Sequence, residues 1–267
     1  MQDRLTKVPS MAIKALATGL VLLWGGVAWS AEVKVMISGG LTAAYKQLVP
    51  EFEHATENKV VTASGPSMGT TYNAIPVRLA RGEPADVLIM VGYALGDLIK
   101  QGKVEADSRV DLARSPIGMV VRAGAPKPDI STAEAFKRTL LAAKSIAFSD
   151  SASGVYVGTE MMEKLGILDQ MKPKSHKIEA DPVAGVVARG DAELGFQQIS
   201  ELIPVPGVDL VGPLPPEVQK ITIFSAGLVT GAKEPEAGRA LIKFLASAAA
   251  APVIQKSGLD PMAANAK

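Results

Sequence analysis

Cysteine is absent from this chain of 267 residues. Without thiols the protein forms no disulfide bonds, has no thiolate nucleophile and offers no cysteine-ligated metal site. The two histidines, His54 and His176, have no neighbours spaced as a catalytic triad or a metal cluster. Glycine-rich phosphate loops and the Gly-x-Ser-x-Gly nucleophile turn are missing too. We therefore expect no metal and no cofactor.

The chain also carries no marked excess of charge of either sign. It has 28 Lys and Arg against 27 Asp and Glu. Without Arg4, Lys7, Lys14 and Asp3, which lie in the first 30 residues, 28 − 3 = 25 basic and 27 − 1 = 26 acidic residues remain. Binding to nucleic acid needs concentrated positive charge. We expect no nucleic-acid partner.

The first 30 residues have the pattern of an export signal. Three basic residues precede an apolar segment at 15–27, and Ala28-Trp29-Ser30 has the small-x-small pattern of a cleavage site. The apolar segment is shorter than the roughly 20 residues that a membrane-spanning helix needs, which favours cleavage after Ser30 over an uncleaved anchor. A cysteine-free exported chain suits the bacterial periplasm, where we expect residues 31–267 to reside.

Strand-like and helix-like segments alternate along residues 31–267. The apolar runs 87–91 and 117–121 predict buried strands, and 41–55 and 236–246 have helical spacing. This alternation is typical of an α/β fold with doubly wound parallel sheets.

The length of the exported part exceeds one typical core, so we expect two lobes. Residues 31–112 and 226–267 are predicted to form lobe 1, and residues 113–225 to form lobe 2. The chain would then cross between the lobes twice.

Three strand ends lead into helices through small hydroxyl and glycine residues, near 38–41, 64–71 and 149–154. In a doubly wound sheet such ends meet at one edge, where ligands bind. Hydroxyls and backbone N–H groups at helix starts suit an oxyanion or a carboxylate, and their recurrence favours a binding cleft over three unrelated turns. The candidate ligand-binding residues are Ser38, Gly39, Gly40, Ser64, Ser67, Met68, Thr70, Arg78, Ser151, Ser153, Tyr156, Gln197 and Gln198.

Charged and titratable candidates are few near these junctions. Arg78 or Arg122 would clamp a carboxylate through two hydrogen bonds, with a solvated arginine as the alternative. Asp150 and Tyr156 flank the third junction and are candidates for an acid or a base, although capping and packing are their commoner roles.

Four motifs occur in a characteristic order: Ser38-Gly39-Gly40-Leu41-Thr42, then 82–87, 151–154 and 189–195. In these motifs the chain resembles the periplasmic substrate-binding proteins of the molybdate-binding type, which are components of ABC importers. The resemblance implies a two-lobed fold, each lobe a mostly parallel sheet flanked by helices, with a small anion trapped between the lobes by hinge closure. It also implies an ABC permease in the inner membrane as partner. We expect a monomer.

The resemblance implies a site for an oxyanion, but this sequence has different residues at several of the family's ligand-binding positions. Gly40 stands where molybdate binders have the first serine, Gln198 stands at the tyrosine of the late strand, and the second loop is longer. These differences favour an organic anion. The exported aconitate isomerases are similar to this family and move a proton along an allylic tricarboxylate without metal or cofactor. We expect a binding protein, with an isomerase as the alternative and a degenerate cleft as a third possibility.

Overall fold

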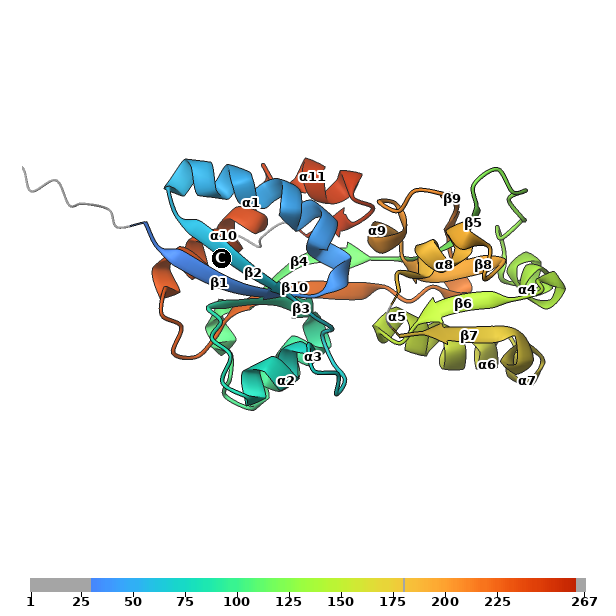
Figure 1. The fold of residues 1–267 in the computed structure, drawn as a ribbon, viewed down its shortest axis with the longest axis horizontal. Helices are drawn as coiled ribbons and strands as arrows, with labels where there is room; N and C mark the ends of the chain where they lie inside the picture. The colour runs from blue at the N-terminus through green and yellow to red at the C-terminus, as the bar shows by residue number, and fades with distance from the viewer. Residues whose placement is uncertain (1–29, 180, 263–267) are drawn as a thin grey trace, which may run out of the picture.

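The computed structural model describes residues 30–179 and 181–262, and it shows two lobes side by side, each built on its own β-sheet (Figure 1). The predicted two-lobed α/β fold is confirmed. The export signal predicted for residues 1–30 lies, except for Ser30, outside the described residues. Within the described residues, no helix combines the length and the apolar character that crossing a membrane requires.

The first lobe is a six-stranded sheet in the order β11-β4-β10-β3-β1-β2. Its strands are β1 (Glu32–Ile37), β2 (Lys59–Ser64), β3 (Val87–Val91), β4 (Val110–Ser115), β10 (Thr222–Leu228) and β11 (Asp260–Pro261). Strand β3 is buried along its whole length because helices cover both faces of the sheet. The helices are α1 (Thr42–Thr56), α10 (Pro235–Leu245) and α11 (Ala251–Lys256) on one face, and α2 (Ile75–Ala80) and α3 (Gly92–Lys100) on the other (Figure 1).

The second lobe is a five-stranded sheet in the order β7-β6-β8-β5-β9. Its strands are β5 (Ile117–Arg122), β6 (Ile146–Ser149), β7 (Ser175–Ile178), β8 (Leu194–Gln198) and β9 (Val208–Pro213). Its helices are α4 (Ala133–Ala142), α5 (Ala152–Tyr156), α6 (Met162–Lys164), α7 (Leu168–Met171), α8 (Val183–Arg189) and α9 (Ile199–Leu202). A π-helical turn, Val157–Met161, joins α5 to α6, and the one-turn 3₁₀ helix η1 (Gly39–Leu41) leads into α1.

Both sheets are mixed. Strands β2 and β3 run parallel to β1, and β7 and β8 run parallel to β6, as the sequence predicts. The strands nearest the connections between lobes reverse this direction: β10 is antiparallel to β3 and β4, and β5 is antiparallel to β8 and β9. The parallel strands still deliver their carboxyl ends to one edge of each sheet, which is what positions the candidate site.

The chain passes between the sheets at Pro116 and again at residues 219–221. The predicted lobe boundaries, near residues 112 and 225, fall inside β4 and β10, and both strands belong wholly to the first sheet. Strand β4 continues almost directly into β5, so the two crossings are short and lie beside each other (Figure 1).

Asp86 explains one of the sequence motifs structurally. This carboxylate is buried just before β3 and accepts hydrogen bonds from the backbone N–H groups of Lys34, Lys233 and Glu234, at 2.7, 2.7 and 3.1 Å. It therefore joins β1 to the start of α10, two segments about 200 residues apart in the chain. The motif at residues 82–87 therefore stabilises the first lobe through Asp86.

Replacing Asp86 by Ala leaves three backbone donors without their acceptor. Hydrogen bonds to charged groups contribute about 1.5–3 kcal/mol each, so we expect a loss of at least about 3 kcal/mol in the free energy of unfolding, measured by urea denaturation. Asp86→Asn retains one carbonyl oxygen and should lose less. Asp97→Ala removes an exposed carboxylate that pairs only with Lys100, and should change stability by less than about 0.5 kcal/mol. Equal stability of the Asp86→Ala and Asp97→Ala variants would contradict this role.

Candidate functional site

Two serines of the first lobe form a short hydrogen-bonded chain at the carboxyl ends of its strands. The backbone N–H of Val91 donates to Ser67 Oγ at 3.0 Å, and Ser67 Oγ donates to Ser38 Oγ at 2.6 Å. Both hydroxyls are buried. Because Ser38 Oγ accepts this hydrogen bond from Ser67, its own hydroxyl hydrogen is available to donate to a further acceptor.

Three serines of the second lobe form a similar cluster where β6 turns into α5. Ser149 Oγ and Ser151 Oγ lie 2.6 Å apart, and Ser151 Oγ and Ser153 Oγ lie 3.5 Å apart. A Cβ atom at Gly154 would collide with the carbonyl group of Ser149, so this turn requires a glycine. The turn thus holds three hydroxyls together at one end of the sheet.

The two lobes are in contact at several points. Ala152, between two of the clustered serines, packs against the first-lobe core group that includes Val91 and Phe224. This contact brings the second-lobe serines up to the strand ends that carry Ser38 and Ser67. We call these five residues, Ser38, Ser67, Ser149, Ser151 and Ser153, the interlobe serines.

A second contact between the lobes involves Glu201 and Gly39. A Cβ atom added to Gly39 would overlap the carboxyl group of Glu201, so this carboxyl lies against the glycine backbone at the start of η1. Gly258 likewise lies against Ile199 and Ile203, where a Cβ would come within 2.7 Å and 2.8 Å of their side chains. Helix α9 of the second lobe therefore packs on the first lobe.

Burial raises the pKa of Glu201 to about 7, and a hydrogen bond from the side chain of Gln197 opposes that increase. Gln197 is itself buried, and its Oε1 atom has no hydrogen-bond partner among residues 30–179 and 181–262. Glu201 therefore changes its protonation state near neutral pH, beside an amide with an unused acceptor. Raised carboxyl pKa values of this kind cluster at functional sites.

The sequence did not identify Glu201 or Ser149 as candidates. Ser149 begins the third junction, at 149–154, but is not among the candidate residues of that junction. Glu201 lies three residues after Gln198, on the short helix α9. An acidic residue immediately after a strand end at the predicted ligand edge was the available signal.

Gln198 contacts the connections between the lobes. Its amide lies between Ser115 on β4 and Thr222 on β10, at 2.8 and 3.0 Å, and either orientation of the amide bonds both hydroxyls. Gln219 adds a second link, because its amide exchanges two hydrogen bonds of 2.9 Å with the backbone of Ile117. Gln198 therefore holds the two crossings together.

Arg78 and Tyr156 are occupied elsewhere. The Arg78 guanidinium pairs with Glu83 and also donates to the carbonyl oxygens of Asn73 and Ser64, so it stabilises the loop after β2. The Tyr156 hydroxyl is buried and donates to the carbonyl oxygen of Val218 at 2.8 Å.

The remaining candidate residues are either exposed or packed in the first-lobe core. Asp150, Ser64 and Thr70 are exposed, whereas Met68 packs against the first-lobe core and accepts a hydrogen bond from the Tyr93 hydroxyl at 3.6 Å. Gly40 lies directly against the ring of Phe224, which leaves no space for a side chain. Among the described residues, no group of three His, Asp or Glu side chains is arranged to hold a metal ion.

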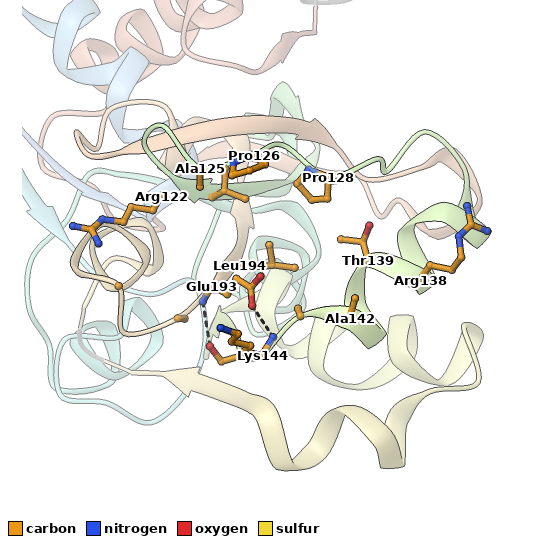
Figure 2. Close-up of a pocket in the computed structure, with 15 residues that line it drawn as sticks. Arg122, Ala125, Pro126, Pro128, Arg138, Thr139, Ala142, Lys144, Glu193 and Leu194 are labelled. Carbon is orange, nitrogen blue, oxygen red and sulfur yellow. Dashed lines mark hydrogen bonds between the residues drawn. The ribbon is translucent and has the colours of Figure 1, made fainter.

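A large surface cavity lies on the second lobe, near α4. It has a volume of about 710 Å³, and its walls include Arg122, Arg138 and Pro128 (Figure 2). Arg122 ends β5, whose first residue follows the crossing at Pro116, so this arginine lies at the end of the strand away from the interlobe serines. Glu193 in this cavity accepts a hydrogen bond from the backbone of Lys144 at 2.6 Å, so its carboxylate has a structural partner.

The chain is similar to known proteins over almost its whole length. The family model described as bacterial extracellular solute-binding protein matches residues 33–260. An aconitate isomerase of Pseudomonas sp. is 48% identical over 256 residues, which cover 94% of this chain and 98% of that protein. A molybdate-binding protein of Azotobacter vinelandii is 29% identical over 265 residues, 93% of this chain and 96% of that protein.

One solved structure is the substrate-binding domain of a putative molybdenum ABC transporter from Clostridium difficile. It superposes with a TM-score of 0.68 at 19% identity and covers 87% of this chain and 100% of its own. At this identity the likeness shows the fold alone.

Replacing Gln198 by Leu removes the amide that bonds the two crossings while keeping the volume similar. Ser115 and Thr222 are buried, and each hydroxyl left without this partner costs about 1–3 kcal/mol. We expect the free energy of unfolding to fall by about 2–4 kcal/mol in urea denaturation. Gln255→Leu, at an exposed position of α11, is the matched control and should be nearly neutral. A Gln198→Leu variant as stable as this control would contradict the linking role.

Proposed function

This chain belongs to the family of bacterial extracellular solute-binding proteins, and we propose that it binds a small organic anion between its two lobes in the periplasm. The observation that carries the proposal is the approach of two serine groups from opposite lobes at the strand ends. An ABC permease of the inner membrane would recognise the closed form of a monomer.

The chemistry of the interlobe serines supports an anion. Hydroxyl groups donate hydrogen bonds to negatively charged oxygens, and such charge-assisted bonds are stronger than those between neutral groups. Ser38 has an available hydrogen because Ser67 donates to it. Donors from two lobes would be joined by one ligand, which gives the ligand a reason to prefer the closed arrangement.

Two features favour a carboxylate over molybdate. Gly40 has no hydroxyl, and Phe224 fills the space next to it. The amide of Gln198, at the position of the tyrosine in molybdate binders, is engaged with Ser115 and Thr222. Two of the groups that would surround a compact tetrahedral oxyanion are therefore missing from this site.

A second candidate function is the isomerisation of aconitate. The specific observation in its favour is the 48% identity to an aconitate isomerase over nearly the full length of both chains. The reaction moves one proton along an allylic tricarboxylate, and it needs carboxylate anchors and one acid–base group. Binding of a tricarboxylate is common to both candidates, and turnover distinguishes them.

A ligand screen tests the binding proposal. Residues 31–267 should melt at a higher temperature with trans-aconitate, cis-aconitate or a similar carboxylate than with molybdate, tungstate or sulfate. A ligand at 100 times its Kd stabilises the folded state by about 2.7 kcal/mol, which corresponds to about 5–11 °C for a chain of this size.

Ser38→Ala and Ser151→Ala should reduce this shift, whereas Ser131→Ala, in an exposed loop of the second lobe, should retain it. A shift with molybdate alone would contradict the organic-anion proposal, and no shift with any anion would indicate a degenerate cleft. Incubation with cis- or trans-aconitate then separates the two candidates, because interconversion would establish the isomerase and saturable binding without interconversion would exclude it.

A further inference from the structure

We propose that Glu201 is the acid–base residue that transfers the allylic proton of a tricarboxylate bound between the lobes. This inference rests on the second candidate function, the isomerisation of aconitate. It starts from the position of the Glu201 carboxyl group, which lies across the lobe interface against the backbone of Gly39.

The contact with Gly39 places a titratable group at the edge where the predicted ligand site lies. Gly39 follows Ser38 directly at the start of η1, so a ligand held by Ser38 is next to Glu201. Glu201 comes from the opposite lobe and reaches this position through α9. The packing of α9 against η1 therefore places the carboxyl group next to Ser38.

The surroundings of Glu201 permit both of its protonation states. Burial, with no charged neighbour contributing, raises its pKa to about 7, so the carboxyl takes up and releases a proton near neutral pH. The Gln197 side chain opposes this rise by favouring the carboxylate form. Its Oε1 is buried and, within the described residues, has no hydrogen-bond partner, so an amide acceptor is available near Glu201. We assign Gln197 as a positioning residue for Glu201.

The step balances without a cofactor. A Glu201 oxygen takes a proton from the methylene carbon of aconitate, and the electron pair of that C–H bond becomes the new C=C bond. The electron pair of the former C=C bond takes up a proton at the former vinylic carbon, which the Glu201 carboxyl returns. Between the two transfers, negative charge spreads onto a substrate carboxylate, where the hydroxyl of Ser38 stabilises it.

The test compares wild type, Glu201→Gln and the exposed control Glu163→Gln in two measurements. The first is aconitate interconversion, and the second is exchange of the methylene protons of aconitate with D₂O, followed by NMR. Positioned acid–base groups contribute about 10²–10⁴-fold, so Glu201→Gln should lower kcat at least 100-fold and abolish exchange. Its thermal shift with trans-aconitate should stay close to that of wild type. Glu163→Gln should behave as wild type in all three measurements.

The pH profile is the readout that a merely structural residue would not affect. In wild type, kcat/KM should rise with pH as Glu201 ionises near pH 7. Glu201→Asp keeps the carboxylate and should retain part of the activity, which also covers the case of a Glu201→Gln variant that does not fold. Gln197→Leu removes the hydrogen bond that lowers the pKa of Glu201, so it should move the profile to higher pH.

The outcomes separate the two proposals. If wild type interconverts aconitate and folded Glu201→Gln remains within 10-fold of it, the role of Glu201 is overturned and the isomerase function stands. If wild type binds aconitate but neither interconverts it nor exchanges its protons, the isomerase function and the role of Glu201 fall together, and the binding proposal stands.

Discussion

The carboxyl group of Glu201, from the second lobe, lies against the backbone of Gly39 in the first lobe, and the proposed chemistry depends on this contact. A side chain at position 39 would overlap the carboxyl, so Glu201 keeps this position only with a glycine there. Burial at this position raises the pKa of Glu201 to about 7. The first lobe thus contributes to the surroundings of a titratable group that comes from the second lobe.

The connections between the lobes make this contact possible. Two short crossings leave the lobes as separate bodies, and the amides of Gln198 and Gln219 bond the crossings to each other. Two short neighbouring crossings of this kind are the geometry of a hinge. The resemblance to oxyanion-binding proteins placed Gln198 at the ligand, whereas the structure places its amide at the crossings. Its two buried hydroxyl partners come from segments distant in sequence, so no local pattern shows them.

Much of the fold was predictable because its signals are local. The run 87–91 is apolar throughout and forms β3, and the helical spacing from Leu41 corresponds to α1. Strand β4 was not predicted, because Val110–Ser115 mixes apolar and polar residues and owes its place to pairing with β10 and β11. The small residues Ser225-Ala226-Gly227 interrupt the apolar pattern of β10, yet they lie inside the strand. A Cβ at Gly227 would approach Val104 to 2.7 Å, so packing accounts for the small residue there.

The sequence predicted the hydroxyl chemistry of the candidate site better than it predicted which residues form the site. Serines after parallel strands converge because strand direction forces them to, and Ser38 and Ser67 meet as expected. Arg78, a candidate for clamping a carboxylate ligand, instead pairs with Glu83, and the sequence did not indicate this pair.

The most direct test of ligand capture between the lobes is a crystal structure with tricarballylate, the saturated analogue of aconitate. Its carboxylates should lie within hydrogen-bond distance of Ser38 Oγ and of Ser151 Oγ or Ser153 Oγ. Binding only in the cavity beside α4, or contact with one lobe alone, would contradict capture between the lobes.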